Sequence, residues 1–310
     1  MLTEIQKKTA EAIVNIFETG SVLGDYGNVT LIAGDTGHLT FGRSQTTLGS
    51  GNLHKLLQQY CASPDARFGA ALTPFLQRFA NIDLSLDHEK YLHNILRASA
   101  DDSSMRDIQD GFFDQTYWQP AERVATQLGI TTPLGIAVVY DSKVHGSGDA
   151  IRDKTNQNNG TLAQLGERKW IAAYVQTRRD WLANHSREDL RKTVYRMHAL
   201  QRLIDLDQWD LELPLVVRAH EISTATLSAA PAGCYDGPKP GSRSLALQTP
   251  LLRGLDVRLV QLGLSKLGGD VEADGVFGKG SLAAVKTYQT THNLPATGAL
   301  DIGSIAQLVG

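Results

Sequence analysis

Two carboxylates in the N-terminal region, Glu18 and Asp35, have the residue types and the spacing that suit catalysis. Glu18 falls in the last turn of an expected helix, Asp35 falls in a glycine-rich turn, and Thr40 follows shortly after it. Two carboxyl groups on separate elements can act as general acid and general base on a bond held between them. Residues 16–52 therefore form the candidate catalytic segment, and the other elements must position it.

The helix that carries Glu18 is expected to begin with a capping box, with Thr3 as its N-cap and Gln6 three residues later. Gly20 is expected to end it. Residues at helical spacing then form one buried face, namely Ile5, Thr9, Ala12, Ile13, Ile16 and Phe17. Glu18 lies beside this face at the negative end of the helix dipole, so we expect a raised pKa, which suits a general acid. The alternative is an ordinary solvated glutamate at a helix end.

Short β-prone segments, 28–32 and 39–41, flank the turn that contains Asp35, and a helix is expected over 50–60. Spacing alone leaves open that Asp35 is an ordinary turn aspartate. The chain from 74 to 128 is expected to be helical, with a break at Asp101-Asp102.

The nearly all-apolar run 133–140 predicts a fully buried helix that leads into Asp141 and His145. An unpaired buried charge is costly, so Asp141 needs cationic partners. The candidates are four later arginines, Arg178, Arg179, Arg196 and Arg202. We interpret most of these residues as a structural ion-pair network, which can also position a catalytic carboxylate.

Composition limits the class of protein. The 310 residues allow one large domain and a small one, and a net charge of -3 does not favour nucleic acid as a partner. No apolar run is long enough for a membrane span, and the N-terminus lacks the pattern of a secretory signal. No cofactor or metal is expected, because the sequence contains neither CxxC nor HExxH. We expect a monomer.

The two cysteines, Cys61 and Cys234, exclude a disulfide framework. We expect two free thiols, although the sequence also allows one bridge.

A change in composition divides the chain near residue 228. Residues 228–242 lose helical periodicity and are rich in Pro, Gly and Ala, which is typical of a linker. The following block shows the periodicity of three short helices. We therefore expect a large domain over 1–228, a linker over 229–250 and a small domain over 251–310.

Four motifs of the large domain, IFETGS, GDTGHLTFGR, TTLGSGN and YDSKVHG, resemble glycoside hydrolase family 46, the chitosanases, over residues 4–215. The resemblance implies a mainly helical, lysozyme-like α+β fold with two lobes and a small β-sheet at the cleft between them. It also implies hydrolysis of β-1,4 linkages between amino sugars with inversion. Inverting glycosidases keep their two carboxyl groups roughly 6.5–9.5 Å apart, which leaves room for a water molecule.

The resemblance assigns a role to each motif residue. Glu18 takes the position of the general acid, Asp35 that of the general base, and Thr40 that of the residue that holds the attacking water. The implied substrate-binding residues are Asn52, His38, Tyr26 and Arg43. The implied supporting charge network consists of Asp141, Arg178, Arg196 and His145.

The sequence departs from the family pattern at two places. The typical Asp-Gly-Arg-Gly turn is replaced by 35–38, Asp-Thr-Gly-His, so an arginine is missing. The family also has an aspartate at the position of Asn52, where its charge receives the ammonium group of a glucosamine unit. A neutral amide cannot supply that charge, although it can hydrogen-bond an N-acetyl group. Asn52 can alternatively be only a helix N-cap.

The small domain has a resemblance of its own. VRLVQLGL, DGVFG, AVKTYQ and the later TG resemble the three-helix bundle of peptidoglycan-binding domains. The resemblance implies a module that binds the cell wall and raises the effective concentration of the enzyme there.

Three functions fit these features. We favour a cell-wall hydrolase of lysozyme type that cuts the β-1,4 glycan of peptidoglycan, because the small domain and Asn52 point away from a charged amino sugar. The alternatives are a chitosanase with a wall-binding module and a non-catalytic wall-binding protein. Retention of Glu18, Asp35 and Thr40 argues against the last. We expect action on the cell wall after phage-type lysis or non-classical export.

Overall fold

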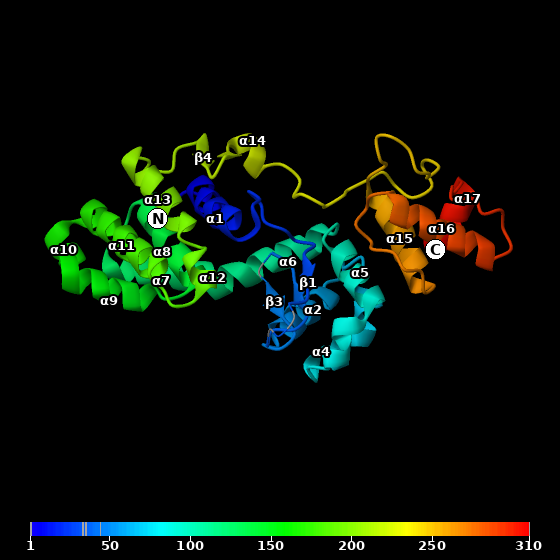
Figure 1. Cartoon of the computed structure of the whole chain (residues 1–310), viewed down its shortest axis with the longest axis horizontal. Coiled ribbons are helices and arrows are strands. Elements are labelled where there is room, and N and C mark those ends of the chain that lie inside the picture. Colours follow the sequence, from blue (N-terminus) through cyan, green and yellow to red (C-terminus); the bar gives the residue numbers. More distant parts are fainter. Residues whose placement is uncertain (1, 33, 35, 44, 310) are drawn as a thin grey trace. The chain divides into compact units, whose positions relative to one another are not determined.

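The computed structural model describes residues 2–32, 34, 36–43 and 45–309. The chain is mainly helical, with 58% of its residues in helices, and carries small antiparallel sheets (Figure 1). It divides into two compact units. Unit 1 comprises Met1–Gly24 and Phe113–Ala229, and unit 2 comprises Asp25–Phe112 and Ala230–Gly310. The region expected as one large domain therefore contributes to both units.

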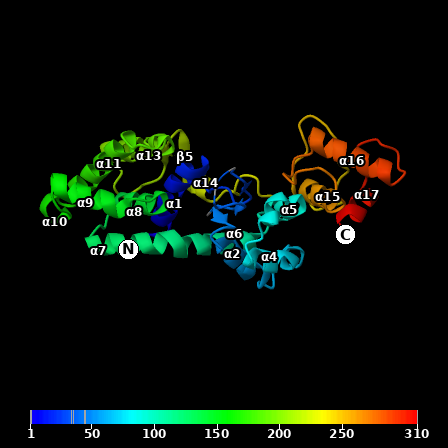
Figure 2. The same ribbon diagram turned by 60° about the horizontal axis from the view of Figure 1, so that its bottom comes forward.

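Unit 1 is built around α8 (Pro133–His145), which lies between α7 (Gln119–Leu128) on one side and α11 (Glu167–Ala183) and α13 (Tyr195–Asp205) on the other (Figure 2). Helix α1 (Glu4–Thr19) also packs on α8. The remaining elements of the unit are η3 (Asp114–Trp118), α9 (Gly148–Asn159), α10 (Leu162–Leu165), α12 (Glu188–Arg191), the hairpin β4 (Leu215–Val217) and β5 (His220–Ile222), and α14 (Thr224–Leu227).

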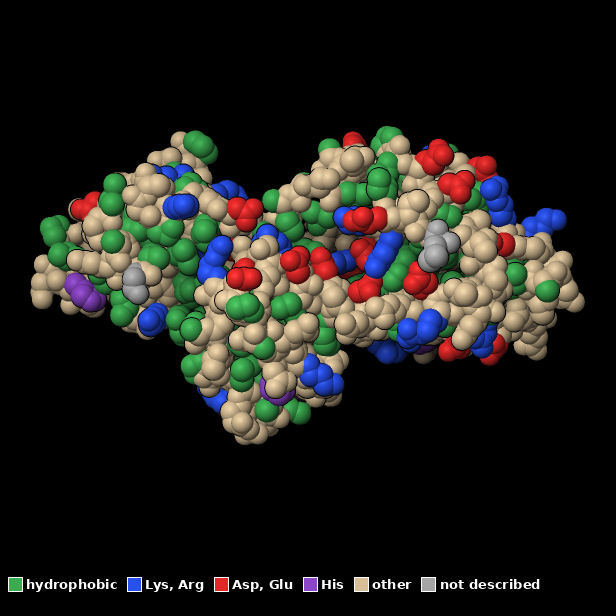
Figure 3. All heavy atoms as spheres, turned by 180° about the vertical axis from the view of Figure 1, so that it is seen from behind, with side chains coloured by type: hydrophobic (Ala, Val, Ile, Leu, Met, Phe, Trp, Pro, Cys, Tyr) green, Lys and Arg blue, Asp and Glu red, His purple; other side chains and the backbone are tan. Residues whose placement is uncertain are grey.

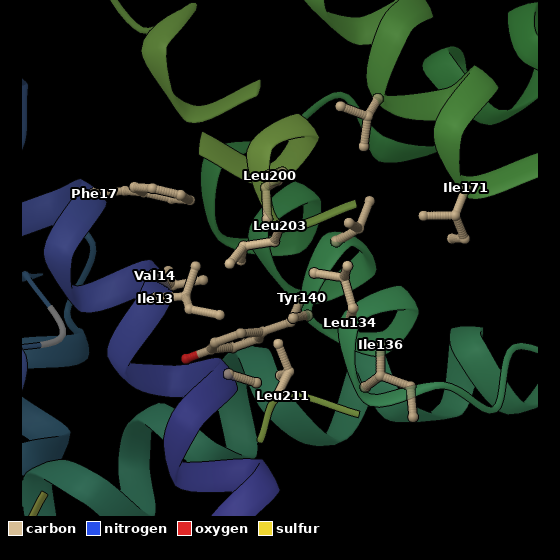
Figure 4. Packing of buried hydrophobic residues seen from close by; sticks show 14 of the residues in the cluster. Ile13, Val14, Phe17, Leu134, Ile136, Tyr140, Ile171, Leu200, Leu203 and Leu211 are labelled. Carbon is tan, nitrogen blue, oxygen red and sulfur yellow. The ribbon is translucent and has the colours of Figure 1, made fainter. Parts of the chain in front are cut away.

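The core of unit 1 forms where α1, α8 and α13 meet. Figure 4 shows Ile13 and Val14 of α1 beside Tyr140 of α8, with Leu203 of α13 next to them. These side chains are almost completely buried. The prediction of a fully buried helix over 133–140 is confirmed, because α8 packs against helices on several sides.

Helix α1 begins and ends where its sequence predicts. Thr3 and Gln6 form the capping box, and Gly20 closes the helix with a left-handed φ of 69°. Of the residues predicted for the buried face, all are buried except Ile5, which is 52% exposed. The helical period identifies the face of a helix but not how far along the helix its partners reach, and Ile5 lies in the first turn.

The first part of unit 2 combines a small sheet with helices. Strand β2 (Thr40–Phe41) pairs on one side with β1 (Val29–Thr30) and on the other with β3 (Thr46–Thr47). The helices are α2 (Asn52–Cys61), α3 (Gly69–Leu72), η1 (Thr73–Phe75), α4 (Leu76–Ala80), η2 (Leu84–His88), α5 (Lys90–Ser99) and α6 (Ser103–Phe113). The predicted break at Asp101-Asp102 is confirmed between α5 and α6.

The second part of unit 2 contains the three expected helices, α15 (Leu255–Lys266), α16 (Lys279–Thr291) and α17 (Ile302–Val309). They enclose a core of their own around Val260, Phe277 and Ile305. Helix α15 also lies beside α5 of the first part (Figures 1 and 2). Cys61 and Cys234 are both free, as expected.

Charged side chains of both signs are interspersed on the face shown in Figure 3. In the part of the chain that the structure describes, no helix has the length and apolar character needed to cross a membrane. Within the same residues, no three His, Cys, Asp or Glu side chains gather to hold a metal ion.

Candidate active site

Glu18 stands in the last turn of α1, as predicted, and is held by Arg196 of α13. Arg196 Nη1 donates a hydrogen bond of 2.7 Å to Glu18 Oε1. The arginine side chain is only 2% exposed, whereas the glutamate side chain is 33% exposed. A buried arginine thus holds one oxygen of the Glu18 carboxyl group, while the side chain stays partly accessible to solvent.

Arg196 joins Glu18 to the buried Asp141 of α8. Its Nε and Nη2 both donate to Asp141 Oδ1, at 3.0 and 2.5 Å. Burial by itself lowers the pKa of Arg196, but the charges of Asp141 and Glu18 outweigh it, and the pKa is raised overall. The guanidinium therefore stays charged and binds two carboxylates from two different helices.

Arg178 of α11 closes the other side of this network. Its Nη1 lies 3.8 Å from Asp141 Oδ2 and donates to Ser142 Oγ, and its Nη2 lies 3.0 Å from His145 Nδ1. Because arginine only donates, Nδ1 of His145 must accept, which requires the neutral imidazole. Burial, followed by the charges of Arg196 and Arg178, lowers the pKa of His145 to about 4.

Two residues near Glu18 were not predicted as site residues. Tyr195 precedes Arg196 on α13, and its hydroxyl donates a hydrogen bond of 2.7 Å to the carbonyl oxygen of Phe17. Successive residues of α13 therefore hold successive residues of α1. Burial, followed by the nearby charge of Glu18, raises the pKa of Tyr117. The only sequence signals are that Tyr195 adjoins Arg196 and that Tyr117 lies in a cluster of aromatic residues.

In unit 2, Thr40 occupies the central strand of the small sheet and is 7% exposed. Its hydroxyl donates a hydrogen bond of 3.0 Å to the carbonyl oxygen of His38. His38 has a positive φ of 58°, which is unusual for a residue with a side chain. Its Nδ1 lies 2.8 Å from Asp87 Oδ2, and the same carboxylate accepts a hydrogen bond from Leu39 N–H. Asp35 lies outside the described residues.

Tyr26 and Arg43 form a buried cluster with α6. The Tyr26 hydroxyl donates a 2.7 Å hydrogen bond to Asp110, and Arg43 forms an ion pair with the same carboxylate. The backbone N–H of Arg43 donates to Gln109 Oε1 at 2.9 Å. Both residues are less than a tenth exposed. The structure gives them a packing role beside the sheet, and their contact with substrate stays a prediction.

Asn52 is the first residue of α2, and Gly51 is the N-cap. The alternative interpretation of Asn52 as an N-cap is therefore wrong by one position. Glycine takes the cap because its left-handed φ of 73° suits a residue without a side chain. The Asn52 side chain is partly exposed and has no hydrogen-bond partner among the described residues. It is available to bind a ligand.

The predicted residues thus gather in two groups, one in each unit. The group in unit 1 joins all members of the predicted network to Glu18, namely Asp141, Arg178, Arg196 and His145. The other arginines considered as partners do not join it. Arg179 instead lies near Asp180, and Arg202 is exposed. The group in unit 2 comprises Thr40, His38, Tyr26, Arg43 and Asn52.

Comparisons with known proteins identify the families of both parts of the chain. The model of glycosyl hydrolase family 46 matches residues 12–215, and that of a putative peptidoglycan binding domain matches residues 253–308. A chitosanase of Bacillus subtilis (strain 168) is 31% identical over 235 residues, which cover 71% of this chain and 84% of that protein.

Solved structures show the same fold. The native chitosanase of Bacillus subtilis MY002 is 27% identical, with a TM-score of 0.61 over 72% of this chain and 100% of that one. A mutant of the same chitosanase, complexed with 6 GlcN, is 28% identical, with a TM-score of 0.59 over 72% and 98%. The Gynuella sunshinyii family 46 chitosanase in complex with chitotetraose is 24% identical, with a TM-score of 0.60 over 72% and 98%, and shows the fold alone. The chain belongs to glycosyl hydrolase family 46 and is a glycoside hydrolase with a C-terminal peptidoglycan-binding domain.

Proposed function

We propose that this glycoside hydrolase is an inverting chitosanase that cuts β-1,4 bonds of a glucosamine-rich glycan. The observation that carries the catalytic part is the position of Glu18, which is fixed by the buried Arg196 yet remains a third exposed. The relative that is 31% identical is named a chitosanase, and one solved structure contains 6 GlcN. These names support chitosan over peptidoglycan, the substrate that the sequence alone favoured.

Glu18 acts as the general acid in this proposal. Arg196 holds its Oε1, and Oε2 has no hydrogen-bond partner among the described residues. Oε2 therefore carries the proton to the glycosidic oxygen as the bond to the leaving sugar breaks. Arg196 stabilises the carboxylate that results, so the network lowers the cost of proton donation. A proton from solvent restores the acid for the next cycle.

Asp35 acts as the general base and removes a proton from the attacking water, with Thr40 as its helper. The Thr40 hydroxyl gives its own proton to the carbonyl of His38, so its remaining lone pairs are free to accept a hydrogen bond from water. Thr40 is thereby preset as an acceptor and orients the water for attack on the anomeric carbon.

Peptidoglycan hydrolysis is the second candidate, because Asn52 is neutral and partly exposed and the C-terminal module matches a peptidoglycan-binding family. Digestion of purified chitosan and of purified peptidoglycan, with products identified by mass spectrometry, separates the two. From chitosan we expect glucosamine oligomers. NMR of the first products should show new reducing ends with inverted anomeric configuration. Muropeptides with new reducing ends, without glucosamine oligomers, would establish the second candidate. If neither substrate yields products and the protein still binds walls, the result would favour a non-catalytic wall-binding protein.

A further inference from the structure

The C-terminal module, defined as residues 251–310, packs closely on the lobe that carries the small sheet. Helix α15 of the module lies along α5, and Leu259 and Leu262 join the hydrophobic core of that lobe. The two parts form a single compact unit. A module on a flexible linker would need no shared core with the lobe beside it.

Asn94 of α5 forms one polar bridge across this contact. Its side-chain amide donates to Ser265 Oγ at 2.9 Å and to the carbonyl of Val271 at 2.8 Å, and its Oδ1 accepts from Ala273 N–H at 2.9 Å. Asn94 is 2% exposed. These three partners belong to the module, whereas Arg97 of α5 adds one longer contact of 3.4 Å to Oδ1. Without the module, the amide N–H groups would lose both of their partners.

Arg258 of α15 forms the second bridge and is 3% exposed. It donates to the carbonyl of Arg97 at 2.7 Å, to that of Gly233 at 2.6 Å and to that of Asp274 at 3.2 Å. It also forms an ion pair of 3.3 Å with the buried Asp101. This one guanidinium therefore ties together the lobe, the linker and the module. An uncompensated charge would remain buried if either partner were removed.

The linker is fixed at the same place. The backbone N–H of Tyr235 donates a 2.7 Å hydrogen bond to Asp101 Oδ1, and the Tyr235 ring lies 5.0 Å from the Arg258 guanidinium. Ion pairs of Arg97 with Glu272 and of Lys90 with Asp270 surround the buried contacts. The more exposed of these pairs contribute little stability, so the buried bridges hold the contact.

The docked module reaches the segment that enters the catalytic sheet. Gly27 lies against Ala100 and against the carbonyl of Arg97, the same carbonyl that Arg258 binds. Asp25, Gly27, Asn28 and Val29 line a polar cavity of about 220 Å³ together with residues 272–274 of the module. Residue 29 begins β1, and β1 pairs with the strand that contains Thr40. The module therefore supports the backbone from which the sheet begins.

We propose that the C-terminal module is a docked structural part of the sheet lobe, so that it supports hydrolysis of short soluble substrates as well as attachment to walls. Its α5-facing side is occupied, and wall glycan must bind elsewhere on the module. The contacts alone support the docking. The expected effect on hydrolysis also rests on the proposed function.

A nicked protein tests the docking. A protease site inserted between Ala229 and Ala230 allows the folded full chain to be cut once, after which size-exclusion chromatography is performed. We expect the fragment 230–310 to elute with the fragment 1–229. Separate elution of the two fragments at micromolar concentration would overturn the proposal.

Two substitutions in the nicked protein test which contacts stabilise the docked module. Arg258→Met should weaken association of the fragments by roughly 30-fold or more, because it leaves Asp101 buried without its partner. Asn94→Ala should weaken it as well without leaving a buried charge, which covers the case that the first variant does not fold. Lys266→Met, at an exposed position of α15, is the control and should elute like the parent. Equal association in all variants would show that these bridges do not hold the module.

The activity arm uses the full chain with a short chitosan oligomer and a wall pull-down. Asn94→Ala should lower kcat/KM on the oligomer while the protein still binds walls. A loss confined to intact walls would mean that the module acts only as an anchor. If the parent cuts neither chitosan nor peptidoglycan, the proposed function fails, and the elution experiment still decides the docking.

Discussion

Arg196 of α13 and Glu18 of α1 share a 2.7 Å hydrogen bond, although 178 residues separate them in the sequence. The same guanidinium binds Asp141 inside α8. The buried network in the core of unit 1 therefore fixes the position of the proposed acid, although Glu18 lies at the end of a helix. This relationship leads to predictions that separate the chemistry of Glu18 from its support.

Replacing Glu18 with Gln should abolish hydrolysis but leave the fold and wall binding intact. Glutamine has nearly the same shape and can still accept a hydrogen bond from Arg196, but it has no proton to transfer. Loss of general acid catalysis should lower kcat by about 10²–10⁴-fold. Initial rates on chitosan oligomers check this, with Glu4→Gln at the exposed start of the same helix as control. A Glu18→Gln enzyme with near-normal kcat would remove Glu18 from the mechanism.

Replacing Arg196 with Met should destabilise unit 1 and also lower kcat. Breaking a buried ion pair from one side costs about 3–5 kcal/mol, measurable as a fall in the free energy of unfolding in urea. Without Arg196, the carboxyl group of Glu18 loses the donor that positions it, so kcat on chitosan oligomers should fall as well.

The control for Arg196→Met is Arg202→Met, on the exposed side of the same helix. We expect it to leave both the stability and kcat unchanged. A stability loss in Arg196→Met without any fall in kcat would show that Arg196 supports the fold but does not position Glu18.

His145 should make the protein less stable in acid. Burial lowers the pKa of His145 to about 4 in the folded chain, compared with 6.5 for an unperturbed histidine. Between these values the unfolded chain binds more protons, so stability falls as pH drops from 6.5 toward 4. His145→Asn keeps an acceptor for Arg178 and removes the titration. Its Tm should vary less between pH 7 and pH 4.5 than that of the parent.

The exposed His198 on α13 is the matched control for this experiment, because its replacement by Asn removes a histidine that faces solvent. His198→Asn should show the pH dependence of the parent. An identical pH dependence of Tm in His145→Asn and the parent would show that His145 does not report on acid stability.

The elements near Glu18 could be predicted because their signals are local. The capping box at Thr3, the helical period of α1 and the apolar run of α8 each determine structure within a few residues. The sequence also showed that Asp141 needs a cation. The need for a cation alone could not select Arg178 and Arg196 over Arg179 and Arg202, because neighbouring positions on a helix face different directions and only packing decides which side is buried. The family resemblance made that choice.

Other features escaped prediction because their cause is distant or weak. Strand β3 has two residues and forms because Thr46 and Thr47 meet β2. Asn94 and Arg258 look like ordinary polar residues on helices, and their burial follows only from the contact between α5 and α15. The Pro- and Gly-rich composition predicts a linker but not where it is held, and Tyr235 of this segment is fixed by Asp101. Such non-local contacts leave no periodic trace in the sequence.

Asn52 gives the sharpest test of substrate charge. Its side chain is partly exposed at the first position of α2 and lacks a partner among the described residues. Asn52→Asp places a carboxylate there, and a helix N-terminus stabilises it by about 0.3–1 kcal/mol, so the fold should not suffer. A charge-assisted contact with a glucosamine ammonium should lower KM for chitosan oligomers by roughly three- to tenfold.

The change in KM should weaken as salt is added, because the attraction is electrostatic, and kcat should stay near that of the parent. Gln58→Glu, at an exposed position of the same helix, adds the same charge elsewhere and should leave KM unchanged. If both variants lower KM equally, general attraction of a polycation explains the effect. If neither does, Asn52 does not face the sugar. A lower KM in Asn52→Asp alone places this residue against an amino group and makes its neutrality a determinant of which glycan is bound.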